Sequence, residues 1–335
     1  MDSVSQFALG AAVSVAVMGR RTAVWKAALW GGIAGTLPDL DAFIDHGDAV
    51  RNMVFHRANS HGLFWLTLGA PMLAWLVHRL DRAKGGFRHW WLAMWLALFT
   101  HPLLDALTVY GTQLLRPFSD FPYYVGSIFI IDPLYTLPLL AGLVIALALR
   151  SNAGWHANTW GLALSTAYLA WSVIAQWHVQ GVVRDNLASR DIRADRVLVT
   201  PAPLNTILWR VVVMHEDRFE EGFYSLLDAG RTIRFDTFVR DAALYRELQD
   251  LEAVRRIATF SHGFFRMHVQ GGEAFITDLR MGQEPGYVFS FRIARREGDR
   301  WVPVTPGNQG GRMNVRAGLA WLWVRTRGVD LPPPR

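Results

Sequence analysis

Cysteine is absent from the 335 residues of this chain. Its absence excludes disulfide bonds and thiolate metal sites, so any metal ligands must come from Asp, His or Glu. Glutamate is missing from the first 179 residues, although that segment carries nine aspartates. The sequence also lacks a Gly-x-Ser-x-Gly elbow, a Walker loop and any basic run that would form a nucleic-acid groove. We therefore expect no nucleic-acid partner.

The two halves of the chain differ in composition. Residues 1–179 carry 11 Lys or Arg and 9 Asp among many Trp, Leu and Ala, whereas residues 180–335 carry 23 Arg and 19 acidic residues. The charge density of the second half is ordinary for a water-soluble protein. Apolar segments that favour membrane helices occur in the first half, at 7–18, 23–37, 62–77, 90–109, 128–149 and 160–177.

These patterns predict two domains. We expect a membrane all-α bundle of about six apolar helices in 1–179 and a soluble α+β domain in 180–335. Short β-rich runs between 197 and 238 predict strands in the second domain, and an amphipathic pattern over 241–258 predicts a helix.

Basic residues cluster in alternate connections between the apolar segments. By the positive-inside rule these connections lie in the cytoplasm, which predicts a multi-pass protein of the bacterial inner membrane. Eight of the nine aspartates then share the outer face with His56, His61 and His101, and the C-terminal domain is outside as well. The basic residues in question are Arg20, Arg21, Lys26, Arg79, Arg82, Lys84, Arg88 and Arg150.

The sharpest candidate for chemistry is the pair His101 and Asp105. Their spacing of four places the imidazole and the carboxylate on one helical face. Pro102, which lies between them, frees backbone groups and can kink the helix toward a cavity. Ionisable groups at membrane depth usually mark a functional site. The alternative is a His–Asp hydrogen bond that only packs helices together.

Further candidates come from three other segments. Asp39 and Asp41 close the second apolar segment, His56 and His61 precede the third, and Asp132 begins the fifth. Taken singly, each also suits a polar helix end or connector. Together with His101 and Asp105 they are enough for two metal ions with mixed Asp/His ligands and a bridging metal-bound hydroxide as nucleophile.

Arg57 lies between the two histidines and is a candidate to clamp an anionic substrate oxygen. We take Arg57, His101 and Asp105 as the candidate catalytic residues.

The chain resembles the YdjM family, also called DUF457, of membrane-bound metal-dependent hydrolases. The resemblance is carried by the stretches GTLPDLDAF, FHRANSHG, THPLLDALTVYGTQLLRPFSDFP and GSIFIIDPLYTLPL. The second half resembles the C-terminal region of a longer subgroup. Ala58 and Gly62 depart from the family pattern, which often has Gly and Ser there. The resemblance implies a hydrolase with one to three divalent metal ions, zinc favoured, and with ligands at Asp2, Asp39, Asp41, His56, His61, His101, Asp105 and Asp132.

The leading hypothesis is an integral membrane hydrolase that cleaves an ester of a lipid-linked or amphiphilic substrate. A weak similarity of the His-x-x-x-Asp spacing to the zinc-dependent phospholipase C and P1 nuclease superfamily favours a phosphoester. One alternative is a non-enzymatic metal-binding or metal-transport membrane protein. Another is a membrane-anchored protein that binds a partner through its soluble half.

Overall fold

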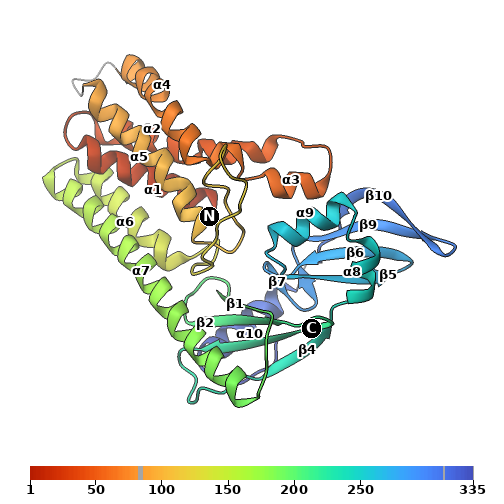
Figure 1. Cartoon of the computed structure of the whole chain (residues 1–335). Coiled ribbons are helices and arrows are strands. Elements are labelled where there is room, and N and C mark those ends of the chain that lie inside the picture. The colour runs from red at the N-terminus through yellow and green to blue at the C-terminus, as the bar shows by residue number, and fades with distance from the viewer. Residues whose placement is uncertain (82–85, 312–313, 335) are drawn as a thin grey trace. The chain divides into compact units, whose positions relative to one another are not determined.

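The computed structural model describes residues 1–81, 86–311 and 314–334 (Figure 1). The chain forms two compact units, and each of them is built from segments that are not consecutive in the sequence. The first comprises Met1–Ile44, His56–Val173 and Pro203–Asn205, and the second comprises Asp45–Phe55, Ile174–Ala202 and Thr206–Arg335. The predicted boundary at residue 179 falls inside one long helix, which contributes residues to both units.

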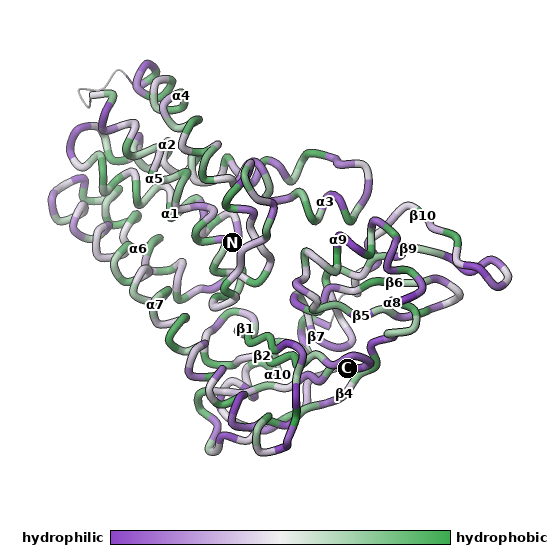
Figure 2. The backbone as a smooth tube through the Cα atoms, in the orientation of Figure 1, coloured by the Kyte–Doolittle hydropathy of each residue, from purple (hydrophilic) through white to green (hydrophobic). Residues whose placement is uncertain are grey.

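The first unit is helical. Its α-helices are α1 (Ser3–Met18), α2 (Val24–Thr36), α4 (Leu63–Asp81), α5 (Phe87–Ala106), α6 (Pro133–Leu149) and the first part of α7 (Asn152–Ser189). Two short 3-10 helices, η1 (Leu37–Phe43) and η2 (Asn59–His61), connect the elements that carry the candidate site. Figure 2 shows hydrophobic stretches along these helices, interrupted by hydrophilic turns.

Helices α1 and α2 approach each other closely because small residues face one another. A Cβ atom added to Gly10 would lie 2.3 Å from the carbonyl oxygen of Gly31, and one added to Gly35 would lie 2.6 Å from that of Gln6. Alanines of α1, α2 and α5 fill much of the remaining core, with Trp90 and Met94 as its large members. This packing brings the end of α2 against α5, where His101 lies.

The prediction of about six apolar membrane helices is wrong. Among the described residues, only α4 is both long enough and apolar enough to cross a bilayer, and a single such helix is weak support for a crossing. Helices α1, α2 and α6 have 16, 13 and 17 residues, which is short of the roughly 20 that a span needs. Arg82 and Lys84, which the charge argument used, lie outside the described residues.

Hydropathy gave the wrong helix lengths because it does not indicate where a helix begins or ends or where polar residues interrupt it. The segment predicted at 128–149 becomes helical only at Pro133. Helix α7 runs without a break for 38 residues and continues past the end of the apolar stretch at residue 177. Helix α5 begins with charged and polar residues and contains His101 and Asp105. The described part of the chain holds ten α-helices and three antiparallel sheets, and it shows no bundle of six apolar membrane helices.

The second unit contains two four-stranded antiparallel sheets with strand orders β1-β2-β3-β4 and β10-β9-β6-β5. The first sheet is formed by β1 (Arg196–Pro201), β2 (Leu208–Met214), β3 (Arg218–Ser225) and β4 (Phe235–Val239). The second is formed by β5 (Phe265–Gln270), β6 (Glu273–Asp278), β9 (Ser290–Glu297) and β10 (Arg300–Asn308). A small ladder pairs β7 (Gly282–Gln283) with β8 (Gly286–Tyr287).

Helices α8 (Ala242–Leu248), α9 (Glu252–Phe260) and α10 (Val315–Thr326) complete the second unit. The single helix predicted over 241–258 is therefore two helices, because a turn closed by the bond from Leu251 N to Leu248 O separates them.

One helix of the second unit comes from the N-terminal half of the sequence. Helix α3 (Ala49–Phe55) packs on α9 and β10, with Val50 and Met53 buried. The Arg51 guanidinium donates to both carboxylate oxygens of Glu252 at 3.0 and 3.2 Å, and Arg256 lies 5.2 Å from the centre of the Phe55 ring. Most of the connection between Asp41 and His56, namely Asp45–Phe55, is thus a folded part of the second unit.

Candidate metal centre

Four side chains of the first unit bring one ligand atom each to a common point. Asp39 comes from η1, His61 from η2, and His101 and Asp105 from one face of α5, as their spacing of four predicts. The four ligand atoms all lie within 4.8 Å of one another, and His61, His101 and Asp105 are fully buried. This is the group with metal-ligand geometry among the residues that the structure describes.

Five of the six separations among these ligand atoms are near those of a tetrahedral site. The two imidazole Nε2 atoms of His61 and His101 are 3.0 Å apart. Asp39 Oδ1 lies 3.5 Å from each, and Asp105 Oδ2 lies 3.2 and 3.4 Å from them. In tetrahedral coordination with metal–ligand bonds of about 2.0–2.2 Å, neighbouring ligand atoms are about 3.3–3.6 Å apart. A buried cluster with this donor set can hold a divalent metal ion.

The orientation of His101 is set by the backbone of α2. Its Nδ1 lies 2.6 Å from the carbonyl oxygen of Gly35, so Nδ1 carries the proton and Nε2 presents its lone pair to the cluster. The close packing of α1 and α2 at Gly35 holds that carbonyl in place. His61 is oriented in the same manner, because its Nδ1 lies 2.9 Å from Ser60 Oγ.

Asp105 uses its two oxygens differently. Oδ1 accepts from Gln6 Nε2 at 3.0 Å, lies 3.3 Å from an Arg57 nitrogen and pairs with the Met1 amine. Oδ2 is buried and accepts no hydrogen bond from any described residue, yet it faces both imidazoles. An orphaned buried carboxylate oxygen is costly, and a metal ion at the centre of the cluster would satisfy it.

Asp41 lies beside the cluster and holds its surroundings. It accepts hydrogen bonds from His56 Nδ1 at 2.7 Å, from the Arg57 backbone at 2.9 Å and from Ser60 Oγ. Burial opposes ionisation of Asp41, but hydrogen bonds from His56, His61 and Ser60 hold the pKa of this carboxyl below its ordinary value. Asp41 thereby holds residues 56–60, which lead into η2.

The carboxylates also act on His61. Burial alone would lower the pKa of this imidazole, whereas the nearby carboxylates of Asp105, Asp39 and Asp41 raise it to about 9. Burial pushes the pKa of Asp39 upward, but the neighbouring imidazoles of His101 and His61 keep it below its ordinary value. Both shifts show that the carboxylates favour positive charge at the centre of the cluster.

The cluster lies in the part of the chain that matches a known protein family. The family described as YdjM inner membrane protein matches residues 1–179, which include every residue of the cluster. The chain belongs to this family. The resemblance found in the sequence motifs is thus confirmed, and the YdjM family is one of inner membrane proteins.

A curated relative of this YdjM-family chain is described as "Uncharacterized protein YfhP" from Bacillus subtilis (strain 168). It is 31% identical over 137 residues, which cover 38% of this chain and 39% of the relative. The match thus spans well under half the length of the relative. No solved structure matches the chain.

The remaining predicted ligands of this YdjM-family chain make other contacts and do not join the cluster. Asp2 caps α1 by accepting from Val4 N and Ser5 N, both at 3.1 Å, and Asp132 caps α6 by accepting from Leu134 N at 3.0 Å. His56 bonds to Asp41 and packs edge-on against Tyr110. The structure thus brings together Asp39, His61, His101 and Asp105 but not Asp2, Asp41, His56 and Asp132.

Arg57 is buried beside the metal cluster in a left-handed conformation, with φ of 64°. Its guanidinium lies 4.9 Å from the centre of the Tyr110 ring, and one terminal nitrogen donates to Thr108 Oγ1 at 3.3 Å. A non-glycine residue in this conformation is strained, and such strain is concentrated at functional sites. The bond from Arg57 N to Asp41 and the bond from Gln113 N to the Arg57 carbonyl oxygen stabilise it.

Sequence reasoning missed three residues that support the site. Gln6 donates to Asp105 and to the carbonyl oxygen of His101, while Thr108 and Tyr110 position Arg57. Gln6 was detectable as an amide at the start of an apolar segment, where an isolated polar group needs a partner. Thr108 and Tyr110 gave no such signal, because their residue types are common at helix ends.

Proposed function

We propose that this YdjM-family protein is a metal-dependent hydrolase that acts on an ester of a lipid-linked or amphiphilic substrate, with a phosphoester favoured. The observation that carries the proposal is the convergence of Asp39, His61, His101 and Asp105, whose ligand atoms all lie within 4.8 Å of one another. Two imidazoles and two carboxylates are a donor set that suits zinc. A divalent ion bound there would supply Lewis-acid activation of water and of the scissile bond.

Arg57 is the candidate for binding the anionic part of the substrate. Its Nε atom is buried and donates to no described residue, while its terminal nitrogens contact Thr108 and Asp105. A guanidinium with a free donor beside the cluster suits an oxygen of a phosphoester, because Arg recognises phosphate through paired N–H groups. Asp41 and Tyr110 hold Arg57 at its backbone and over its face.

Exposed apolar side chains next to the cluster support an amphiphilic substrate. Leu40 and Phe43 share η1 with Asp39 and are 54% and 86% exposed. Helix α4, which follows His61, leaves Leu68 and Met72 uncovered as well. Exposed apolar surface of this kind marks a contact with lipid or with a partner, and the family's place in the inner membrane favours lipid.

The first test is the metal content of the purified full chain. We expect wild type to hold stoichiometric divalent metal by elemental analysis and His101→Ala to lose it. His156→Ala is the matched control, because His156 is exposed on α7 and bonds only to the carbonyl oxygen of Asn152. Retention of full metal by His101→Ala would contradict the proposed site.

The second test is hydrolysis of phospholipid and isoprenoid-phosphate substrates with and without a chelator. We expect activity that the chelator removes and added zinc restores, and that Arg57→Gln reduces without loss of metal. If the metal is held but no ester is cleaved, the non-enzymatic metal-binding alternative replaces the hydrolase.

A further inference from the structure

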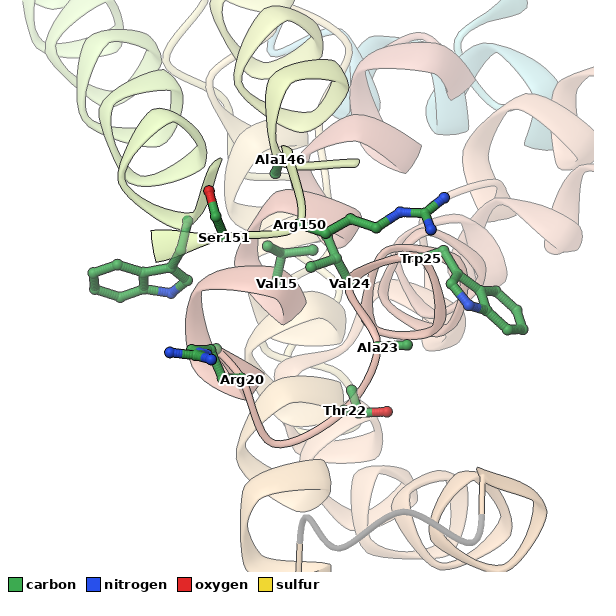
Figure 3. Close-up of a pocket in the computed structure, with 11 residues that line it drawn as sticks. Val15, Arg20, Thr22, Ala23, Val24, Trp25, Ala146, Arg150 and Ser151 are labelled. Carbon is green, nitrogen blue, oxygen red and sulfur yellow. The ribbon is translucent and has the colours of Figure 1, made fainter. Parts of the chain in front are cut away.

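A second polar site lies in the first unit at the connections α1–α2 and α6–α7. It is a pocket of about 250 Å³ whose lining includes Arg20, Arg150, Trp25, Trp155 and Ser151 (Figure 3). Figure 3 shows Arg20 and Arg150 flanking the pocket, with Arg150 extending toward Trp25. None of its lining residues belongs to the metal cluster, so the proposed hydrolase chemistry leaves the pocket unexplained.

The charge of this pocket is uncompensated. No acidic residue lines it, and neither Arg20 nor Arg150 forms an ion pair with a carboxylate in the part of the chain that the structure describes. Arg20 reaches only the side-chain oxygen of Asn152, at 3.5 Å. The nearby Asp81 is already occupied, because Lys26 Nζ lies 2.8 Å from it and Thr22 Oγ1 donates to it at 3.0 Å. The two guanidiniums therefore lack a counterion.

Two helices begin at the pocket and add positive potential. Ala23, Val24 and Trp25 are the N-cap and first residues of α2, and Ala23 provides no side-chain cap. Helix α7 begins at Asn152, directly after the lining residue Ser151. The first N–H groups of a helix have no intrahelical acceptor and favour an anion.

Several carbonyl groups at the helix ends beside the pocket already accept hydrogen bonds, which makes them less available to repel an anion. Val15 O accepts from Gly19 N at 2.9 Å, and Met18 O accepts from Arg21. In α6, Ala146 O accepts from Arg150 N and Leu147 O accepts from Arg150 Nε at 3.2 Å. The terminal nitrogens of Arg150 are left for another acceptor.

We propose that this pocket binds the phosphate of an anionic phospholipid headgroup. Two guanidiniums and two helix N-termini supply the donors that a phosphodiester needs. Trp25, which is 53% exposed, and Trp155 are amphipathic rings of the kind that lie at the headgroup level of a membrane. The family's inner-membrane location brings such lipids to the protein, which favours a lipid over free phosphate.

The test compares lipid retention by purified full-length variants, measured by native mass spectrometry and by titration in detergent micelles. The probes are phosphatidylglycerol, phosphatidylcholine and inorganic phosphate. The pocket variant is Arg20→Gln with Arg150→Gln. The control is Arg79→Gln with Arg88→Gln, which removes two exposed charges from the end of α4 and the start of α5, outside the pocket.

We expect the pocket variant to bind phosphatidylglycerol about tenfold more weakly than wild type, and the control to bind within about twofold. Equal weakening in both variants would reduce the effect to general surface charge and overturn the proposal. Competition by inorganic phosphate at the same concentration as phosphatidylglycerol would overturn the lipid assignment, as would equal binding of phosphatidylcholine.

An experiment on the unaltered protein guards against a variant that fails to fold. A photoactivatable phosphatidylglycerol with its reactive group near the headgroup should label peptides that contain Trp25 or Trp155. Labelling that avoids both peptides would contradict the pocket. Metal content serves as a separate readout, since the pocket shares no residue with the metal cluster.

Discussion

Both units bury charged side chains, but they treat them in opposite ways. In the second unit, Glu221 accepts from Arg210 Nε at 2.8 Å and lies 2.6 Å from a terminal nitrogen of the same guanidinium. Arg210 also donates to the Leu279 carbonyl oxygen and to the Tyr287 hydroxyl. In the first unit, the four atoms of the metal cluster converge without such partners, and Asp105 Oδ2 accepts no hydrogen bond from the described residues.

The difference separates two reasons for burying charge. A carboxylate and a guanidinium that satisfy each other hold strands in register and need nothing else. Carboxylates and imidazoles that point their lone pairs at one another repel unless a cation lies between them. The same residue types therefore indicate a structural pair in one unit and a ligand site in the other.

The largest expected effect comes from breaking the structural pair. Glu221→Gln would leave the Arg210 guanidinium buried without a counter-charge, and we expect the free energy of unfolding to fall by about 3–5 kcal/mol. Denaturant titration monitored by circular dichroism measures it. Glu247→Gln, on the exposed face of α8, is the control and should change stability little. A loss below about 1 kcal/mol would show that the pair is not stabilising.

Metal removal should separate the two clusters. With metal at a hundred times its dissociation constant, a chelator is expected to lower the stability of wild type by about 2.7 kcal/mol. His101→Ala should show no such dependence, whereas Glu221→Gln should keep it in full, because its defect lies in the other unit. Thermal melts with and without chelator measure both. Chelator sensitivity in His101→Ala would place the ion elsewhere.

Residue type and helical spacing predicted much of the candidate site. All four converging residues were among the candidates, and the spacing of four between His101 and Asp105 placed them on one face of α5. Spacing could not decide between Asp39 and Asp41, which are two residues apart in the same short 3-10 helix. That choice depends on the turn of η1, which directs Asp41 toward His56 and the Arg57 backbone.

The fold was harder to predict from the sequence than the candidate site, for a related reason. Hydropathy reports how apolar a segment is, but helix length depends on where caps and tertiary contacts stop it. Asp132 caps α6, which therefore starts only at Pro133. Helix α7 continues through polar residues because its later part belongs to the second unit and packs in that unit's core. The folding of Asp45–Phe55 into the second unit rests on contacts with residues some 200 positions away, such as Arg51 with Glu252. No local pattern predicts such a pairing.

Asp41 offers a smaller change that sharpens the comparison within the first unit. Asp41→Asn should leave the four ligands in place but weaken the hold on His61, His56 and Arg57, and we expect metal affinity to fall about 10–100-fold. Competition with a calibrated chelator measures it. Asp45→Asn is the matched control, because Asp45 is exposed and only caps Gly47 N and contacts Asn52. Complete loss of metal in Asp41→Asn would instead make Asp41 a ligand.

The smallest effect is expected at Asp2, where the comparison is between a ligand and a helix cap. Asp2 accepts from the backbone of α1 and from Ser5 Oγ at 2.5 Å. Asp2→Ala should therefore lower the free energy of unfolding by about 1 kcal/mol, the usual cost of losing an N-cap, while metal content stays unchanged. Asp2→Ser should restore most of the stability, because a serine hydroxyl caps nearly as well. Loss of metal in both variants, with stability kept in Asp2→Ser, would show that Asp2 is a metal ligand and not only a helix cap.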